Sequence, residues 1–544
     1  MLYTALDQYR HRQATQYHFL SGKIAAQSRS PAQIYQAAET IASNLQQLGI
    51  DKGDRVCLVI ADQQAFIECF FACILNGAVA VPLSPPGINT RQASYDEKLL
   101  HVLNASQTTL LVTDCLELND ELISPDMIKV SSTDELLQAT TAMLKSVALS
   151  PDDTCFLQFT SGSTGMPKGV IVSYRNLDSN IGAMVRTLNV TEDDVVVSWL
   201  PMHHDMGLIG KVLTPLHTGC KAVYIPTSRF IRNPGLWLSA LSEYRGTLSF
   251  GPNFSLALVS KRMQRVPKGE LDLSSVRVLG CGAEPINDSV LRQFIETLQP
   301  YGLQPTAVLP SYGMAEATLA VSFKRYGSHF RSMTIDRQRY FEDRTVAIAD
   351  DQTAEQITIV SCGEVFDDFD IRIVDEQNQP LAEGRVGEIL LRGDSVCSGY
   401  FNNPVETQRA FVDGWLRTGD QGYLYDGQLY ICGRTKDVVI VNGKNIFPQD
   451  IEWRIDLIEG MRAGGTVAIG VPDNNTEQLY LICELRNSNE IPEADITREC
   501  YAACGVAPHQ VIYVKTGSLP KTTSGKIMRS KVRSLLSENQ LARL

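Results

Sequence analysis

The first part of the chain alternates between segments with one apolar helical face and short apolar runs, and this alternation constrains the fold most. Between Ile34 and Leu48 apolar residues recur at spacings of three and four, which predicts an amphipathic helix that ends at Gly49. The pattern continues with predicted strands at 55–60, 78–83 and 109–113 and predicted helices at 65–76 and 97–105. Such alternation indicates an α/β fold with a mostly parallel sheet that is covered on both faces.

The length of the chain, 544 residues, predicts more than one domain. From Ile357 onward short alternating strands, such as 370–374 and 387–392, are joined by turn-rich segments. We therefore expect a large N-terminal domain at 1–435, built of α/β layers with a β-rich subdomain at about 357–435. A small α+β C-terminal domain at 436–544 is expected to follow.

The composition excludes some classes of function. The net charge of −12 argues against nucleic acid as a partner, because phosphate backbones are bound by basic surfaces. The chain has 13 cysteines and no Cys-x-x-Cys pair. The closest spacings, Cys69/Cys73 and Cys500/Cys504, correspond to one helical turn, which favours buried free thiols over a metal site.

The same features predict a cytoplasmic protein. The cysteine count is odd and the first residues lack the pattern of a signal peptide. The most apolar stretch, 65–83, carries Glu68 and Asn76 and is broken by Gly77 and Pro82. It is therefore predicted to be a buried helix that leads into a strand, with no membrane span.

The segment 159–169, with the sequence Phe-Thr-Ser-Gly-Ser-Thr-Gly-Met-Pro-Lys-Gly, concentrates glycines, hydroxyls and one lysine after a predicted strand. Glycines let backbone N–H groups turn toward phosphate oxygens, hydroxyls add donors, and Lys168 adds a positive charge. The segment does not contain a Walker A motif. By itself it is equally compatible with a flexible surface turn.

Four further motifs follow in a fixed order, and they decide between these readings. They are Tyr-Gly-Met-Ala-Glu at 312–316, Trp-Leu-Arg-Thr-Gly-Asp at 415–420, Gly-Arg-Thr-Lys-Asp at 433–437 and Pro-Lys-Thr-Thr-Ser-Gly-Lys at 520–526. With these motifs the sequence resembles the adenylate-forming superfamily, which includes acyl-CoA synthetases, adenylation domains of peptide synthetases and fatty acyl-AMP ligases. The resemblance runs through nearly the whole chain and implies ATP and Mg²⁺ as cofactors.

The resemblance assigns roles at the nucleotide. The loop would hold the phosphates, Glu316 would bind Mg²⁺, and Asp420 would accept hydrogen bonds from the ribose hydroxyls. Glu316 could instead interact only with a helix dipole, and Asp420 could belong to an ordinary Gly-Asp turn. The residues assigned to ATP or AMP are Thr160, Ser161, Gly162, Ser163, Thr164, Lys168, Gly282, Ala283, Tyr312, Gly313, Met314, Asp420 and Arg434.

The resemblance also names catalytic residues. Lys526, before a helix predicted at 527–537, would bridge the carboxylate and the α-phosphate, although this basic segment could also be a solvated face. His204, in a His-His-Asp sequence that is a weak candidate for a metal site, would close the acyl site. Lys436 would be the hinge about which a mobile C-terminal domain rotates between adenylation and thioester formation.

The acyl pocket is expected in two apolar segments, 206–213 and 250–254. No Asp or Lys stands in an evident position to meet an amino group, so a fatty acid is a better candidate than an amino acid. The residues assigned to the pocket are Met206, Gly207, Phe250, Asn253 and Phe254.

Several details are similar to fatty acyl-AMP ligases, which lead lipids into polyketide and peptide assembly lines. The segment 323–359 resembles an insertion of that subgroup, which is thought to hinder transfer to CoA. The expected acceptor is therefore the phosphopantetheine thiol of an acyl carrier protein. The alternatives are an acyl-CoA synthetase, a peptide-synthetase adenylation enzyme, for which no carrier domain follows Leu544, and a catalytically silent protein that binds nucleotide or acyl ligand.

Overall fold

The structure is a computed structural model, and it describes most of the chain. The described residues are 1–21, 26–86, 92–116, 128–138, 142–160, 166–263, 271–350, 352–353, 355–441, 444–473, 476–485, 491–522 and 526–544.

One sheet orders its strands β6–β5–β3–β4–β7–β8, and all neighbours are parallel except the hairpin β7–β8. This confirms the predicted parallel sheet, since three of its central strands are the ones that the alternating pattern indicates. The strands are β3 (Arg55–Val59), β4 (Val79–Pro82), β5 (Leu110–Thr113), β6 (Lys129–Ser132), β7 (Thr154–Thr160) and β8 (Lys168–Ser173).

A second sheet follows the order β17–β14–β13–β12–β11–β9–β10–β1–β2. Its middle strands, from β13 to β1, are parallel, and antiparallel strands complete both edges. The strands are β1 (Tyr17–Leu20), β2 (Ala26–Arg29), β9 (Val195–Ser198), β10 (Lys221–Tyr224), β11 (Leu248–Gly251), β12 (Val278–Cys281), β13 (Val308–Gly313), β14 (Ala320–Phe323) and β17 (Glu364–Val365).

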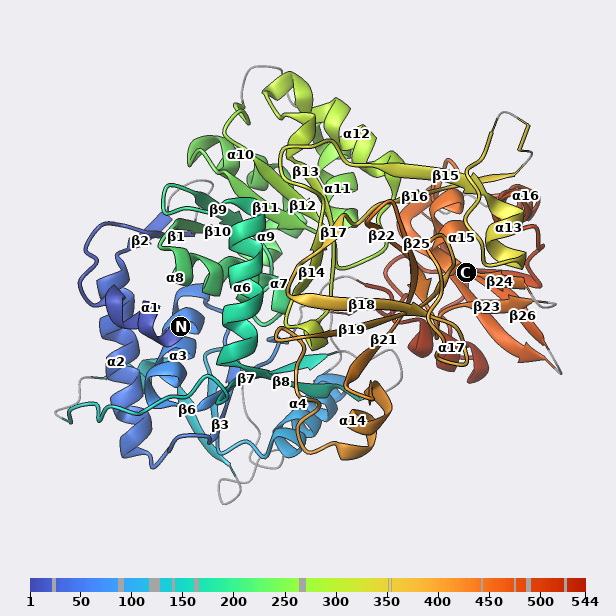
Figure 1. Ribbon diagram of the computed structural model, residues 1–544. Coiled ribbons are helices and arrows are strands. Elements are labelled where there is room, and N and C mark those ends of the chain that lie inside the picture. The colour runs from blue at the N-terminus through green and yellow to red at the C-terminus, as the bar shows by residue number, and fades with distance from the viewer. Residues whose placement is uncertain are drawn as a thin grey trace.

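Helices cover the two sheets, and α6 lies between them, where it contacts both β8 and β14 (Figure 1). Ser173 and Asn176 form a capping box that fixes the start of α6. These helices are α1 (Leu2–Tyr9), α2 (Pro31–Gln47), α3 (Gln63–Asn76), α4 (Gln92–Ser106), α5 (Thr133–Leu136), α6 (Tyr174–Leu188), α7 (Asp205–Leu208), the π-helix η1 (Ile209–Leu213), α8 (Thr214–Thr218), α9 (Thr227–Arg232), α10 (Gly235–Glu243), α11 (Asn253–Met263), α12 (Asp288–Leu298) and the 3₁₀ turns η2 (Gln299–Tyr301), η3 (Pro305–Ala307) and η4 (Ala315–Ala317).

A β-rich region follows the second sheet, in agreement with the predicted fold class. Its sheet orders β18–β19–β21–β20, and β22 pairs with β21. The segment that resembles an insertion forms a hairpin and a short helix beside it. The elements are β15 (Ser332–Asp336), α13 (Arg337–Glu342), β16 (Gln356–Val360), β18 (Phe369–Val374), β19 (Gly387–Gly393), α14 (Pro404–Ala410), β20 (Phe411–Val412), β21 (Trp415–Tyr425) and β22 (Gln428–Arg434).

The C-terminal part combines strands and helices around hydrophobic clusters of its own, which contain only residues from Val439 onward. In Figure 1 it forms the orange and red part, with the yellow helix α13 beside it. Its elements are β23 (Val439–Val441), β24 (Lys444–Ile446), α15 (Pro448–Ile455), β25 (Met461–Asp473), β26 (Thr476–Leu485), α16 (Glu493–Cys504), β27 (Gln510–Val514) and α17 (Arg529–Ser537).

One helix start differs from the prediction. Helix α17 begins at Arg529, because Ile527 pairs with Lys521 in an extended bridge and Met528 has non-helical backbone angles. Among the described residues, no helix combines the length and the apolar character that crossing a membrane requires.

Candidate active site

The parallel strands of the second sheet end at one edge, and the predicted site residues follow these ends. The chain leaves β9 toward His204, β11 toward Asn253, β12 toward Ala283 and β13 toward Glu316. Ligands of open α/β sheets bind at the carboxyl ends of parallel strands. A cavity of about 1970 Å³ lies here, between this edge, the β-rich region and the C-terminal part.

The structure brings most of the predicted site residues together in this cavity. Ser161, Gly162, Ser163 and Thr164 lie outside the described residues. Gly282 is described but does not line the cavity: a Cβ there would lie 2.5 Å from Ser311 Oγ, so its position demands close packing. The predicted residues that line the cavity are Thr160, Lys168, His204, Met206, Gly207, Phe250, Asn253, Phe254, Ala283, Tyr312, Gly313, Met314, Glu316, Asp420, Arg434, Lys436 and Lys526.

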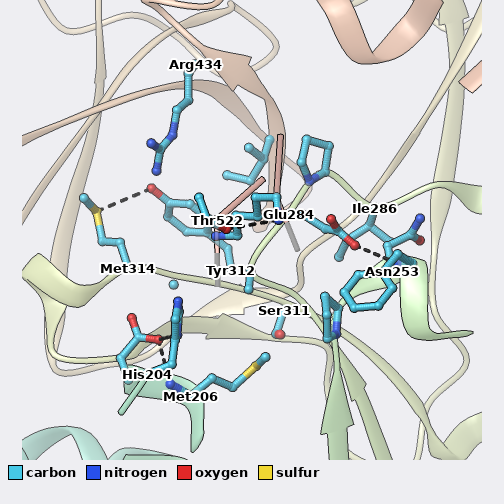
Figure 2. Close-up of a pocket in the computed structure, with 18 of the residues that line it drawn as sticks. His204, Met206, Asn253, Glu284, Ile286, Ser311, Tyr312, Met314, Arg434 and Thr522 are labelled. Carbon is cyan, nitrogen blue, oxygen red and sulfur yellow. Dashed lines mark hydrogen bonds and ion pairs between the residues drawn. The ribbon is translucent and has the colours of Figure 1, made fainter. Parts of the chain in front are cut away.

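Asp420 is the centre of one polar cluster. The register of β21 and β22 places it opposite Arg434, with Arg434 Nε 3.3 Å from Asp420 Oδ1. The hydroxyl of Tyr312 donates to Asp420 Oδ2 at 2.6 Å. The Asp420 carboxylate raises the pKa of Arg434, so this arginine stays charged. Figure 2 shows Arg434 pointing toward Tyr312 and Met314.

Glu316 lies in the turn η4 after β13 and accepts a hydrogen bond from the Tyr400 hydroxyl at 2.8 Å. The expected helix start is a single 3₁₀ turn, so a helix dipole is a poor explanation for this residue. Burial raises the pKa of Glu316 above its ordinary value. A cation at this carboxylate would oppose that effect, since a nearby positive charge favours the ionised form.

Thr160 and Lys168 are opposite each other at the end of the β7–β8 hairpin, and both line the cavity. Lys168 forms an ion pair with Glu406 of α14, and its Nζ lies 5.1 Å from the centre of the Tyr400 ring. The loop lysine and the Glu316 carboxylate therefore share one neighbour, Tyr400.

His204 precedes α7, and its Nδ1 lies 2.5 Å from Asp205 Oδ1. Met206 N donates to the same carboxylate oxygen at 2.6 Å. A Cβ at Gly207 would lie 2.0 Å from the Pro201 carbonyl oxygen, so only glycine allows this helix to approach the preceding loop. In Figure 2 His204 faces the cavity from the side opposite Arg434.

Lys526 reaches the cavity from the C-terminal part. Its backbone is fixed by two hydrogen bonds with Thr522, at 2.7 and 3.1 Å. Burial lowers the pKa of Lys526, as does the positive charge of Arg434, while Asp205, Glu284 and Asp420 act in the opposite direction. Carboxylates of three separate segments thus partly offset the effect of burial on this side chain.

The residues that follow β12 form hydrogen bonds with the residues that follow β11. Ala283 adopts a positive φ of 69°, and the neighbouring Glu284 accepts a hydrogen bond from Phe254 N at 2.7 Å. Asn253 accepts from Asn287 N at 3.2 Å. These bonds fix the start of α11, where two of the predicted acyl-pocket residues lie.

The predicted apolar segment 206–213 contains an exception. Lys211 lines the cavity and is only 5% exposed, a buried charge that the sequence analysis did not single out. The overall hydrophobicity of this segment hid it, because periodicity predicts which positions are buried and not what a buried lysine faces.

Other site residues also escaped the sequence analysis. Asp205 directly follows His204 and could have been noticed, since a carboxylate beside a histidine commonly orients it. Tyr400 and Glu406 gave no signal, because they meet Glu316 and Lys168 only through the tertiary fold. Among the described residues no cluster of three His, Cys, Asp or Glu side chains could hold a metal ion.

Comparison with known proteins agrees with this geometry. A family model described as AMP-binding enzyme matches residues 4–401. A putative acyl-CoA synthetase of Caulobacter vibrioides is 34% identical over 514 residues, which cover 92% of this chain and 89% of the relative. The medium-chain-fatty-acid–[acyl-carrier-protein] ligase JamA of Moorena producens is 32% identical over 551 residues, with coverage of 96% and 93%. A solved structure from a study of fatty acyl-adenylate ligases of E. coli and L. pneumophila has a TM-score of 0.91 and 33% identity, and covers 99% of this chain and 98% of that chain.

Proposed function

Because this chain belongs to the AMP-binding enzyme family and is an adenylate-forming ligase, we propose that it activates a fatty acid with ATP and transfers the acyl group to an acyl carrier protein. The observation that carries the proposal is the single cavity that joins a polar end, with Asp420, Arg434 and Lys526, to an end with aromatic and aliphatic walls. A fatty acid has one reactive carboxylate and a long apolar chain, which matches the two ends.

In the first step a carboxylate oxygen attacks the α-phosphorus, the bond from phosphorus to pyrophosphate breaks, and acyl-adenylate forms. Lys526 stabilises the charge that develops between the carboxylate and the α-phosphate. Asp420 accepts hydrogen bonds from the ribose hydroxyls, and Arg434 completes that end of the nucleotide. His204, oriented by Asp205, closes the acyl side.

Glu316 is the residue proposed to hold Mg²⁺. Its carboxylate lines the cavity, uses one oxygen to accept from Tyr400, and has a pKa that burial raises. These features fit a hard cation that takes one carboxylate oxygen from the protein and its other ligands from phosphate and water. When bound, the ion supplies charge neutralisation at the phosphates.

The second step is proposed to follow rotation of residues 436–544 about Lys436. Lys436 is exposed, in a turn directly after β22, and the clusters from Val439 onward could move as one body. Rotation withdraws Lys526 and lets the thiol sulfur attack the acyl carbonyl carbon, and AMP leaves. Residues 1–435 remain the proposed large domain.

Contacts of the segment 323–359 bear on the proposed rotation. Arg337 of α13 donates to the Ala502 carbonyl, Glu342 lies 3.5 Å from Lys444 Nζ, and Tyr340 packs on Phe447 at 5.8 Å. Each contact ties this segment to the C-terminal part and would have to break or shift during rotation. A carrier protein as the acceptor is supported by the name of one relative, an acyl-carrier-protein ligase.

The test is a product assay with purified protein, MgATP and a mixture of fatty acids of different lengths, with either CoA or a panel of phosphopantetheinylated carrier proteins. We expect acyl-AMP to accumulate with CoA, and an acyl group to appear on at least one carrier protein. Mass spectrometry identifies both products.

One control and two possible outcomes make the assay specific. Omission of ATP removes every product if adenylation comes first. Formation of acyl-CoA at a rate equal to carrier loading would replace the proposal with an acyl-CoA synthetase, the activity named for another relative. Absence of any acyl-AMP with all acids would reject the fatty-acid substrate.

A further inference from the structure

Lys211 lies within the π-helix η1, on the wall of the cavity. A π-helical turn is a rare element that often marks functional sites. Its main chain is fixed, because the Tyr224 hydroxyl donates to the Lys211 carbonyl oxygen at 2.9 Å. The side chain is only 5% exposed, which is unusual for a lysine.

The ammonium group of Lys211 has an incomplete environment. Its Nζ lies 3.9 Å from the centre of the Phe250 ring. Within the described residues it makes no hydrogen bond and no ion pair. An ammonium group at a cavity wall with no acceptor in the protein needs water or a ligand for its hydrogen bonds, and one cation–π contact replaces them only in part. Burial accordingly lowers the pKa of Lys211 to about 7.

The aromatic wall under Lys211 is fixed in position. Phe250 packs against Phe323 with ring centres 5.8 Å apart. A Cβ at Gly280 would lie 2.0 Å from the Phe250 ring, so this position leaves room only for glycine. The Phe250 ring beside Lys211 is therefore held in place by its neighbours.

The cavity that Lys211 lines also has an extensive apolar lining. The cavity wall contributed by neighbouring elements includes Met184, Leu188, Val196, Leu248, Ala320 and Phe323. Lys211 follows His204 by seven residues of continuous helical chain, α7 and then η1, so the two side chains leave this segment at different levels. An acceptor for Lys211 would thus belong to the acyl chain, well away from the reacting carboxyl group.

We propose that Lys211 is a specificity residue that recognises a hydrogen-bond-accepting oxygen on the distal part of the acyl chain, such as a second carboxylate, a hydroxyl or a keto group. The inference rests on the proposed function and restricts its substrate class: the preferred substrate is a fatty acid with an oxygen on its distal part. An oxygen acceptor would complete the environment of the ammonium group, which a plain alkyl chain leaves unpaired.

The test compares three matched series of acids over a range of chain lengths: plain monocarboxylic acids, ω-hydroxy acids and α,ω-dicarboxylic acids. Pyrophosphate release gives kcat/KM for each acid with the wild type and with Lys211→Met, which removes the charge at similar volume. Lys221→Met, at an exposed lysine of β10, is the control.

We expect the wild type to prefer an oxygenated acid over its plain counterpart by at least tenfold at one chain length, mainly through KM. Lys211→Met should remove that preference, and Lys221→Met should keep it. A dicarboxylic preference would indicate ion pairing, and an ω-hydroxy preference would indicate neutral hydrogen bonding.

Two results would overturn the inference. The first is a wild type that prefers plain acids at every length, a measurement that needs no variant. The second is a preference that Lys211→Met leaves within twofold. Thermal unfolding gives a separate readout: loss of an unpaired buried charge should not lower the melting temperature, whereas a strong decrease would indicate a structural role. Failure to activate any acid would instead reject the proposed function.

Discussion

The two ends of the cavity each contain a lysine, and the two lysines differ in their surroundings. Lys526 stands among Asp205, Glu284 and Asp420, and these carboxylates favour its charged form. Lys211 faces the ring of Phe250, and burial lowers its pKa with no carboxylate acting in the opposite direction. The difference suggests that the nucleotide end is electrostatically organised before substrate binds, whereas the acyl end is completed by the substrate.

Lys526→Ala should lower the rate of acyl-adenylate formation by roughly 10²- to 10³-fold, because it removes one transition-state donor. Pyrophosphate release measures the rate. Lys531→Ala, at an exposed lysine of α17, should remain close to wild type. Near-wild-type adenylation by Lys526→Ala would exclude this residue from the mechanism and leave the two lysines without a functional contrast.

Asp420→Asn should raise KM for ATP by about 10- to 100-fold, since hydrogen bonds to a charged acceptor contribute roughly 1.5–3 kcal/mol. An ATP titration of the adenylation rate measures the effect. Asp426→Asn is the matched control in the exposed turn that follows β21. An unchanged KM would show that Asp420 organises only Tyr312 and Arg434, and not the ribose.

Lys436→Pro should reduce transfer to the thiol by about tenfold and spare adenylation, because proline restricts the backbone at the proposed hinge. This variant tests a further difference between the two lysines. Rotation would remove Lys526 from the cavity after adenylation, whereas Lys211 would stay in place. Single-turnover assays separate the two steps. Equal loss of both would argue against a hinge at this residue.

Glu68→Gln should raise the free energy of unfolding by roughly 1–3 kcal/mol at pH 8. Glu68 is buried in α3 outside the cavity, and burial raises its pKa from 4.5 to about 7. The folded state therefore binds the proton more tightly than the unfolded state, and the wild type loses stability as the pH rises from about 4.5 to about 7.

The measurement for Glu68 is urea unfolding at several pH values. The advantage of Glu68→Gln should be greatest above pH 7 and disappear near pH 4.5. A difference that does not depend on pH would show that packing, and not the buried charge, decides the effect. This result would also weaken the argument that the unpaired Lys211 is costly.

Much of the fold was predictable because it depends on local pattern. Periodicity of three and four located α2, and apolar runs located β3, β4 and β5 within a residue or two. The start of α17 was not predicted, because a bridge between Lys521 and Ile527 competes with the helix there.

The candidate site also has a part that the sequence predicts and a part that it does not. The order of motifs was sufficient to indicate an adenylate-forming enzyme and to name Lys526, Asp420 and Glu316. The partners of such residues were not predictable: Tyr400 reaches Glu316 and Glu406 reaches Lys168 across long separations in the sequence. A motif fixes the type of residue at a position, whereas a contact depends on where distant strands end.

The sequence by itself thus determined the fold class, the family resemblance and the residues available for chemistry, because these are properties of pattern and order along the chain. Only the tertiary structure decided that Lys211 faces the cavity over Phe250, and that the segment 323–359 holds the C-terminal part. The physical reason is that burial and pairing are set by neighbours in space, and the free energy of a charged group depends on those neighbours more than on its adjacent residues.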